Sequence, residues 1–415
     1  MKIAVWHNLP SGGGKRALYN HVKGLTMRGH VVEAWCPETA DRSFLPLSEL
    51  ITEHVVSVPS KKRRASFVGD PLCDFRAIVD RLSAMEHSAQ EAAKLINKGG
   101  FDLLFANSCR YFYMPVGLAC HMDIPKLIYL HEPNRKLYES LPSLPWAALP
   151  SRKELGISKL KYCKRFIWNL IRVQGLRIQV REEIYNAKSF DAILANSFFS
   201  RESILRAYGI NAKVCYLGVD SDLYKPTAEN KGSYLVGLGG VDFGKGIERV
   251  ISAIARVSEG IRPECIWIGN FTNERYQREL QDMALAKKVK ISFEINLKDT
   301  EVVKLLGRAL AMIYCPRLEP FGLAPLEANA CGVPVIAIAE GGVRETVHHG
   351  VNGVLVSNDE PGELAEAISA LARNPNDARS LGLSARRHVE ENWTWDKAID
   401  RLENCFDVLL RQEGK

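Results

Sequence analysis

Short apolar runs alternate with stretches of helical periodicity along most of this chain. The first group consists of an apolar run at 2–6, a glycine-rich turn at 12–14, a helical pattern at 15–28 that Gly29 ends, and a second apolar run at 31–35. Strand, helix and strand in this order form the βαβ unit of a parallel, doubly wound sheet. The same reasoning predicts further strands at 103–106, 126–130 and 192–195.

A second α/β series begins near residue 234 and continues the alternation. It predicts strands at 234–237, 265–268, 290–293, 312–315, 335–337 and 353–356, with helices at 247–257 and 300–309. A linker is expected at 218–232, which is rich in Asp, Pro, Asn and Gly. A chain of 415 residues favours two domains of about 200 residues each. We therefore expect an α/β fold with one domain at 1–217, a second at 218–393, and a final amphipathic helix at 394–415 that could pack back on the first domain.

An irregular insert is expected at about 139–183, inside the first domain. It is rich in proline at first (Pro142, Pro145, Pro150), and from 152 to 181 it contains nine Lys or Arg against the single acid Glu154. Aromatic and aliphatic residues are interleaved with these cations. Such a segment either lies on an anionic membrane surface as an amphipathic helix, or is an ordinary helix with its basic face in water. The net charge of +7 also indicates an anionic partner without choosing among nucleotide, lipid head group and nucleic acid.

Several features bear on the compartment. No apolar run approaches the roughly 18 residues that a membrane span needs. The first residues enter a strand directly and do not resemble a signal peptide. The ten cysteines form no CxxC pair, so neither a zinc site nor a disulfide framework is expected. We expect a cytoplasmic protein, with peripheral attachment to the inner face of the membrane if the basic segment binds lipid.

Two glutamates eight positions apart, Glu319 and Glu327, mark the most informative stretch of the chain. Pro320, Phe321 and Gly322 lie between them in a loop, and a helix is expected to begin at Ala324 or Pro325. Glu327 would then lie about one turn into the helix. Free backbone N–H groups at a helix start favour anions, phosphates above all. The alternative is a surface loop with two solvated carboxylates.

Two glycine-rich turns follow the first strand of each series. The first is Gly12-Gly13-Gly14, and the second runs from Gly239 to Gly246 and includes Lys245. Backbone without side chains can approach a ligand closely, and a lysine before a helix start can meet a phosphate. A plain turn and a solvent-exposed lysine are the alternatives. Neither turn fits the dinucleotide or P-loop fingerprint, which disfavours an NAD-dependent oxidoreductase.

Polar residues also follow other predicted strands. The run from His131 to Arg135 comes after the strand at 126–130, at the edge where open α/β sheets bind ligands. A further strand-to-helix turn at 341–346 carries Arg344 and Glu345, which could equally be surface charges of a first helical turn.

Together these stretches resemble the retaining glycosyltransferases of GT-B type in glycosyltransferase family 4, over nearly the whole chain. The most specific match is the pair Glu319 and Glu327 with the residues that follow it, 328–335. Other matches are Lys245-Gly246, Asn196-Ser197, the run 218–220 and the run 341–345, and the run 131–135 is similar to one in mannosyltransferase-like members.

The resemblance implies a GT-B fold, in which two Rossmann-like domains with doubly wound parallel sheets face each other across a cleft. It implies a nucleotide-sugar donor held mainly by the C-terminal domain, an acceptor on the N-terminal side, and no metal or other cofactor. Among the matched positions, Glu319, His131 and Lys245 would be catalytic, since Glu319 faces the transferred sugar, His131 the reacting centre and Lys245 the leaving diphosphate. Donor contacts would come from Gly13, Gly14, Arg317, Phe321, Gly322, Leu323, Ala324 and Glu327, and Arg135 would lie on the acceptor side.

One departure from the family pattern is Gly240, where members usually have an arginine that grips the diphosphate. Arg317 or Arg344 would have to replace it. The resemblance thus implies a retaining, metal-independent transfer of a sugar to a saccharide or lipid-linked saccharide, and the run 131–135 favours a mannose-like sugar. A nucleotide-sugar epimerase and a weakly active nucleotide-sugar-binding protein are the alternatives. A nucleic-acid partner is not expected, because no recognition motif occurs.

Overall fold

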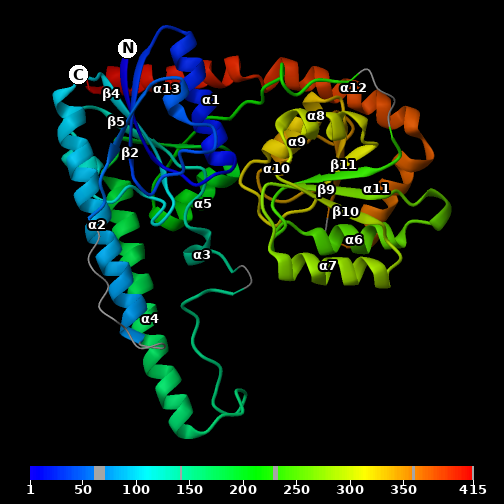
Figure 1. The fold of residues 1–415 in the computed structure, drawn as a ribbon, viewed down its shortest axis with the longest axis horizontal. Helices are drawn as coiled ribbons and strands as arrows, with labels where there is room; N and C mark the ends of the chain where they lie inside the picture. The colour runs from blue at the N-terminus through cyan, green and yellow to red at the C-terminus, as the bar shows by residue number, and fades with distance from the viewer. Residues whose placement is uncertain (60–70, 141–142, 228–231, 358–359, 414–415) are drawn as a thin grey trace. The chain divides into compact units, whose positions relative to one another are not determined.

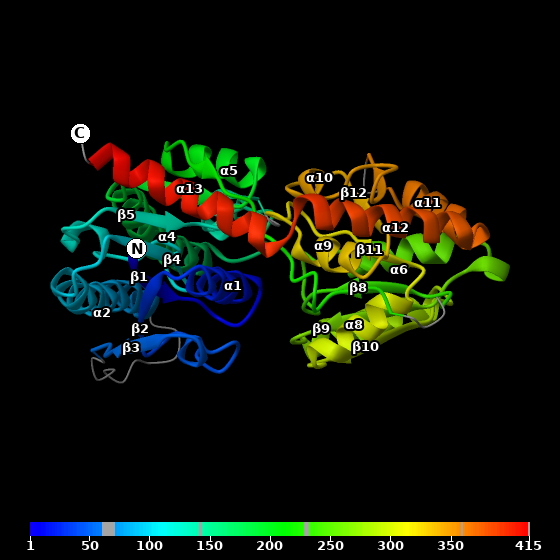
Figure 2. The same cartoon turned by 90° about the horizontal axis from the view of Figure 1, so that it is seen from above.

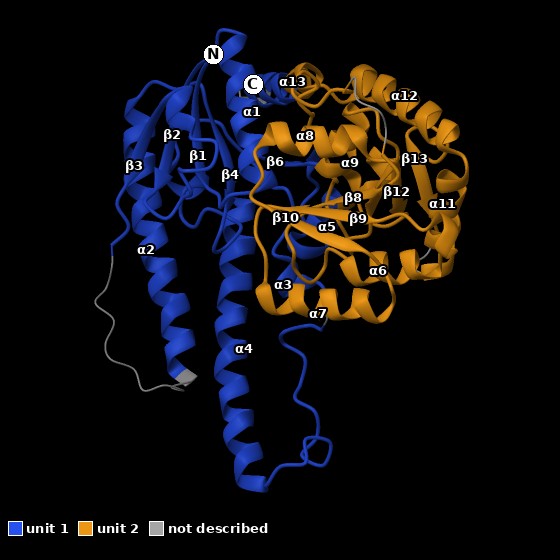
Figure 3. Ribbon diagram, turned by 45° about the vertical axis from the view of Figure 1, so that its right-hand side comes forward, with its two compact units in different colours: residues 1–196, 200–215, 402–415 blue, residues 197–199, 216–401 orange. Residues whose placement is uncertain are grey.

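A computed structural model describes residues 1–59, 71–140, 143–227, 232–357 and 360–413. Pro142 of the expected insert and residues 228–231 of the expected linker lie outside these ranges. The chain divides into two compact units (Figure 3): unit 1 comprises 1–196, 200–215 and 402–415, and unit 2 comprises 197–199 and 216–401.

Unit 1 is built on a seven-stranded parallel sheet with strand order β3-β2-β1-β4-β5-β6-β7. The chain winds outward from β1 in one direction and from β4 in the other, so the switch point lies between these two strands. The strands are β1 (Lys2–Asn8), β2 (Val31–Pro37), β3 (Thr52–Val56), β4 (Leu103–Cys109), β5 (Lys126–Tyr129), β6 (Ala192–Ala195) and β7 (Lys213–Val214).

Helices cover both faces of this sheet. The helices are α1 (Gly13–Met27), α2 (Pro71–Lys98), α3 (Arg135–Tyr138), α4 (Lys159–Lys188), α5 (Phe198–Tyr208), and the short 3-10 turns η1 (Leu47–Glu49) and η2 (Ala119–His121). On one face, residues of α2, α4 and α5 join a core with Trp6 and Trp35. On the other, the ring of Phe105 in β4 contacts His21 of α1. This alternation follows from the period of two along each strand.

Unit 2 is built on a six-stranded parallel sheet with strand order β10-β9-β8-β11-β12-β13 and its switch point between β8 and β11. The strands are β8 (Leu235–Leu238), β9 (Cys265–Gly269), β10 (Ile291–Ile295), β11 (Ala311–Tyr314), β12 (Val335–Ile338) and β13 (Gly353–Val356). All four residues of β11 and of β12 are buried, as expected for central strands covered on both sides.

The helices of unit 2 also lie on both sides of their sheet, with α6 and α7 on one side and α8 and α9 on the other (Figure 1). The helices are α6 (Ile247–Arg256), α7 (Glu274–Ala286), α8 (Asp299–Arg308), α9 (Leu323–Ala330), α10 (Val343–Thr346), α11 (Pro361–Arg373), α12 (Pro375–Asn392) and the 3-10 turn η3 (Glu259–Ile261).

The last helix, α13 (Trp395–Glu413), begins in unit 2 and ends in unit 1 (Figure 2). Its residue Phe406 is fully buried, and its ring lies 5.5 Å from that of Phe105 in β4. The C-terminal helix thus supplies part of the core of the first sheet.

The two doubly wound parallel sheets confirm the predicted fold class. In the insert at 139–183 the basic part is helical, as both interpretations of that segment predicted: residues from Lys159 on form the 30-residue helix α4. Sequence reasoning also missed β3 and α2. None of the described helices is both long and apolar enough to cross a membrane.

Candidate functional site

Three loops pack against one another at the carboxyl edge of the unit 2 sheet, after β8, β11 and β12. A Cβ on Gly246 would lie 2.1 Å from the carbonyl oxygen of Cys315, and Gly246 has φ 69°. A Cβ on Gly341 would lie 2.5 Å from the carbonyl oxygen of Glu319, and one on Gly342 would lie 2.1 Å from that of Pro320. Only glycine allows these backbones to approach so closely, so the glycines fix how the loops lie.

The paired residues Lys245 and Glu319 lie on two of these loops. Lys245 Nζ donates to Glu319 Oε2 at 3.1 Å, and both side chains are only partly exposed. Burial and the nearby carboxylate of Glu319 raise the pKa of the buried Tyr314, at the end of β11, well above its usual value. A cation and a carboxylate are therefore held side by side at the switch point of the sheet, where α/β proteins bind ligands.

The start of α9 completes this edge. Gly322 precedes the helix with φ 97°, no side chain caps it, and no acid lies in its first turn. The backbone N–H groups of Leu323 and Ala324, its first residues, are therefore suited to binding an anion. The helix begins at Leu323, one residue before the predicted start. Glu319 lies on the preceding loop and the buried Glu327 lies in the helix, as the sequence predicted.

The buried Phe321 lies between these elements. Its ring lies 5.7 Å from that of Trp393 and 6.2 Å from that of Tyr216. The side chain of Phe321 is therefore part of the support beneath the loop, and its backbone is the part expected at the donor.

The structure gives a steric reason for Gly240. A Cβ at this position would lie 2.3 Å from the ring of Phe271, so any larger side chain needs that ring to move. Both suggested replacements for the missing arginine already have partners: Arg317 Nε donates to Glu340 Oε1 at 3.1 Å, and Arg344 Nε donates to the carbonyl of Gly341 at 3.2 Å. Arg317 is 42% exposed along its side chain, which leaves it able to turn toward an anion.

Glu345 is a structural carboxylate rather than a loose surface charge. It accepts hydrogen bonds from the backbone N–H groups of Phe198 (2.8 Å) and Phe199 (3.0 Å) and from the hydroxyl of Tyr216 (2.8 Å). The proton of Tyr216 is held firmly, because burial and this carboxylate raise its pKa. Glu345 therefore holds the backbone of Phe198 and Phe199, which belong to the same unit.

In unit 1, His131 follows β5 and lies against the start of α1. A Cβ on Gly14 would lie 3.5 Å from Nε2 of His131, so this glycine brings the helix start close to the imidazole. Burial lowers the pKa of His131 to about 4, so the ring is neutral near pH 7. Its Nε2 is buried and has no hydrogen-bond partner among the described residues. Gly13 is the first residue of α1, which has neither a capping side chain nor an acid in its first turn.

The loop after His131 is held by two sets of contacts. Arg135 donates from Nε to Glu139 Oε2 at 2.6 Å and lies 3.6 Å from Glu132. Asn134 Nδ2 donates to Glu183 Oε1 of α4 at 3.1 Å. Glu183 is fully buried, and burial raises its pKa to about 7. Glu183 thus joins the loop that carries His131 to the long helix.

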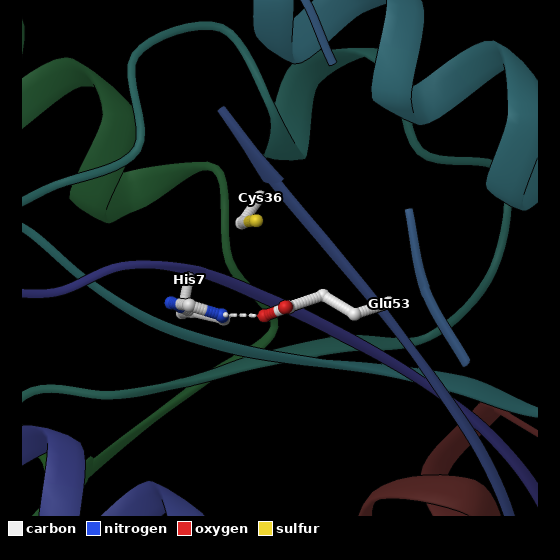
Figure 4. Close-up of side chains that lie close together, drawn as sticks. All are labelled: His7, Cys36 and Glu53. Carbon is white, nitrogen blue, oxygen red and sulfur yellow. Dashed lines mark hydrogen bonds and ion pairs between the residues drawn. The ribbon is translucent and has the colours of Figure 1, made fainter. Parts of the chain in front are cut away.

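A polar cluster is formed by His7, Cys36 and Glu53 on the first three strands of this sheet (Figure 4). His7 Nε2 of β1 lies 3.1 Å from Glu53 Oε1 of β3, and the thiol of Cys36 in β2 lies within 4.8 Å of both. Burial lowers the pKa of His7 and raises that of Cys36 to about 12. The buried Lys15 lies close enough to Glu53 to interact with it electrostatically, while its Nζ lacks a hydrogen-bond partner among the described residues.

Within the described part of the chain, one group of side chains could hold a metal ion. It consists of His7, Cys36 and Glu53, whose ligand atoms lie within 4.8 Å of one another. Zinc binds these side-chain types. The buried ammonium of Lys15 opposes a divalent cation, because like charges repel strongly where water is excluded. We therefore interpret the cluster as a balanced set of buried charges between Lys15 and Glu53.

Sequence reasoning identified Glu319, Glu327 and Lys245 in unit 2, and His131, Gly13 and Gly14 in unit 1, and each group lies at the carboxyl edge of its sheet. It missed Tyr314, Glu183, Lys15 and the His7 cluster. Lys15 directly follows the glycine triplet and could have been found there. Glu183 carries no local signal, since its environment is made by residues distant in sequence.

Two family models match the chain. The model described as Glycosyltransferase Family 4 matches residues 11–223, just over half of the chain, and the model described as Glycosyl transferases group 1 matches residues 204–388.

Curated relatives match over part of their length. The chain is 28% identical over 234 residues to a D-inositol 3-phosphate glycosyltransferase of Catenulispora acidiphila, covering 51% of this chain and 56% of that protein. It is 26% identical over 232 residues to a GDP-mannose-dependent phosphatidylinositol monomannoside mannosyltransferase of Mycolicibacterium smegmatis, covering 51% and 61%. The chain thus spans about half the length of the curated relatives that it matches.

Solved structures match along the whole chain. Anabaena Alr3699/HepE, in a complex with UDP and glucose, gives a TM-score of 0.71 at 20% identity and covers 98% of this chain and 100% of that one. WaaG, a glycosyltransferase involved in lipopolysaccharide biosynthesis, gives a TM-score of 0.64 at 15% identity, with 98% and 99% covered. At these identities the likeness establishes the GT-B fold.

Proposed function

The chain belongs to glycosyltransferase family 4, and on that premise we propose that it transfers a hexose from a nucleoside-diphosphate sugar, with retention of configuration and without a metal ion. The observation that carries the proposal is the pairing of Lys245 with Glu319 beside the uncapped start of α9. A diphosphate needs a cation and aligned N–H dipoles where negative charge develops, and both are present here.

The roles in unit 2 follow from charge. Lys245 would leave Glu319 for the β-phosphate, where its ammonium stabilises the departing nucleoside diphosphate. Glu319, released from Lys245, would face the sugar and stabilise the positive charge that develops at its anomeric carbon, as carboxylates do in glycoside chemistry. Glu327 would bind the ribose, and the backbone from Phe321 to Ala324 would meet the diphosphate.

In unit 1 we assign His131 to the sugar at the reacting centre and Arg135 to the acceptor. A neutral imidazole with an open Nε2 can hydrogen-bond a hydroxyl in either direction. Gly13 and Gly14 expose the backbone of the α1 start, which suits a phosphate. Arg317, exposed enough to turn, is our candidate for a second cation at the donor.

For the substrates we propose a mannose-like donor sugar and a saccharide or lipid-linked saccharide acceptor. The similarity of the run 131–135 to mannosyltransferase-like members supports the sugar. The name of the M. smegmatis relative, which contains both GDP-mannose and a phosphatidylinositol acceptor, supports the pairing of such a donor with a lipid acceptor. A lipid-linked acceptor would bring the enzyme to a membrane surface.

The test is a thermal-shift panel of UDP-glucose, UDP-galactose, GDP-mannose and ADP-glucose on the full chain, followed by an assay of nucleoside-diphosphate release with a lipid extract as acceptor. Binding of the right donor raises the melting temperature by mass action. Stabilisation by one donor and acceptor-dependent release support the proposal. No shift with any nucleotide sugar would overturn it.

The absence of a side chain at Gly240 keeps a second candidate open, a protein that binds a nucleotide sugar and either interconverts its sugar or does nothing to it. The same experiment separates these outcomes. A shift with sugar epimerisation and no acceptor dependence indicates an epimerase, and a shift without any turnover indicates a binding protein.

A further inference from the structure

The first turns of α4 extend beyond the helix that packs beside it. Helices α2 and α4 run side by side in the same direction (Figure 1). A Cβ on Gly175 would lie 2.9 Å from Ile78 near the start of α2, and Val173 is the first buried residue of α4. Ile78 lies seven residues after the start of α2 at Pro71, so that start is level with about residue 168 of α4, and residues 159–167, about 14 Å of helix, lie beyond it. We call residues 159–170, which end shortly before the buried Val173, the overhang.

The overhang carries apolar side chains that nothing described in the chain covers. Leu160 is 82% exposed, Phe166 46%, Ile167 55% and Leu170 53%. At about 100° of turn per residue these four positions fall within one sector of the helix. Clustered large apolar groups of this kind on a protein surface mark a place of interaction.

Cations occupy the adjoining sector. Lys161, Lys164 and Arg165 are all exposed, and Lys164 Nζ lies over the ring of Trp168 at 5.3 Å from its centre. From 155 to 181 the chain contains no Asp or Glu. The overhang therefore has an apolar sector, with Lys159 in it, next to a sector that carries three cations, Trp168 and no acid.

The positive charge of the overhang indicates which kind of partner binds its apolar sector. A second copy of the chain would bring the same cations against one another, with no acid in either overhang to offset them. An anionic bilayer instead attracts the cations and takes the apolar side chains into the boundary between head groups and acyl chains.

We propose that the overhang binds an anionic lipid bilayer, with Leu160, Phe166, Ile167 and Leu170 in the membrane boundary and Lys161, Lys164 and Arg165 on the lipid head groups. This inference goes beyond the transfer reaction, because vesicle binding requires neither donor nor acceptor. Its failure is therefore distinguishable from failure of the proposed function.

The test is flotation of the full chain with vesicles of phosphatidylcholine alone and of phosphatidylcholine mixed with phosphatidylglycerol. The wild-type chain should float with the anionic vesicles only, and less so as salt is raised. The triple variant Lys161→Gln, Lys164→Gln, Arg165→Gln should lose about two orders of magnitude in vesicle affinity. The double variant Ile167→Ser, Leu170→Ser should lose at least about tenfold.

Matched controls make the same chemical changes elsewhere. Lys23→Gln, Lys287→Gln, Arg379→Gln removes three exposed cations, and Leu285→Ser, Leu383→Ser removes two exposed apolar groups. Both controls should float like the wild type, and all four variants should keep the wild-type unfolding midpoint because every changed side chain is exposed.

Three results would overturn the proposal. The first is a wild-type chain that ignores anionic vesicles. The second is an apolar variant that floats as well as the wild type. The third is a dimer, detected by light scattering, that the apolar variant abolishes without any change in flotation, which would make the overhang a contact between copies.

Discussion

Replacing Lys245 by methionine should separate stability from catalysis. Methionine keeps an unbranched stem of similar length and removes the charge. Lys245 and Glu319 are 34% and 18% exposed along their side chains, and the atoms that pair lie 3.1 Å apart. A pair as accessible to water as this contributes about 0.2–1 kcal/mol to folding. The free energy of unfolding should therefore fall by no more than about 1 kcal/mol.

The kinetic effect should be much larger. Charge develops on the leaving diphosphate only as the bond to the sugar breaks, so a cation placed there acts mainly on the transition state. Removal of one such group costs about 2.7–4 kcal/mol, which is a factor of about 100 to 1,000 in kcat. Lys245→Arg, which keeps the charge, should recover part of this loss.

The assay measures nucleoside-diphosphate release at saturating and limiting donor, beside urea unfolding of the same preparations. Lys287→Met, at an exposed position in the same unit, is the matched control and should behave like the wild type. The reasoning is refuted if Lys245→Met retains wild-type turnover. It is also refuted if the loss of turnover is matched by an equal loss of folding free energy.

Three further outcomes follow from the structure. Gly246→Ala should lower the free energy of unfolding by more than about 2 kcal/mol, because the new Cβ overlaps the carbonyl of Cys315 and the backbone has positive φ. Gly244→Ala also has positive φ but meets no neighbouring atom, so in the same urea experiment it should lose only the part that comes from backbone strain. Burial raises the pKa of Glu183 in the folded state from about 4.5 to about 7, so the folded state binds this proton more tightly than the unfolded state does. The resulting stabilisation of the fold is complete below about pH 4.5. It is lost, by a few kcal/mol, as the pH rises through about 7. Glu183→Gln should abolish that slope in urea titrations at pH 5 and 8, and an unchanged slope would contradict the assignment. Burial lowers the pKa of His131 to about 4, so NMR should find its ring neutral from pH 6 to 8. The pH profile of kcat/KM should therefore contain no inflection near 6.5 due to His131, and the profile of His131→Asn should have the same shape as that of the wild type.

The parts of the fold that could be predicted from the sequence are those with local signals. Strand 103–106 and strand 192–195 are short apolar runs with polar residues after them, and β4 and β6 occur there. The missed strand β3, with Glu53 and His54 among its five residues, looks polar. The side chain of Glu53 is only 3% exposed, next to His7 and Lys15, and these neighbours come together only in the folded sheet.

The candidate site shows the same division. The loop with Glu319 and the helix with Glu327 could be placed from Pro, Gly and apolar residues around them. The pairing of Lys245 with Glu319 joins residues 74 positions apart, and no local pattern encodes it. The reason for Gly240 is likewise a ring 31 positions away, that of Phe271. The individual site residues could be predicted from the sequence, whereas the contacts between them across the edge of the sheet could not.

The crossing of α13 from unit 2 to unit 1 has a consequence for biosynthesis. Residues 1–196 of unit 1 are synthesised before all of unit 2 from Tyr216 on, yet the ring of Phe406 packs on that of Phe105 within unit 1. The hydrophobic surface around Phe105 therefore stays open to water until α13 has been synthesised. A chain truncated before α13 would expose an apolar surface in unit 1.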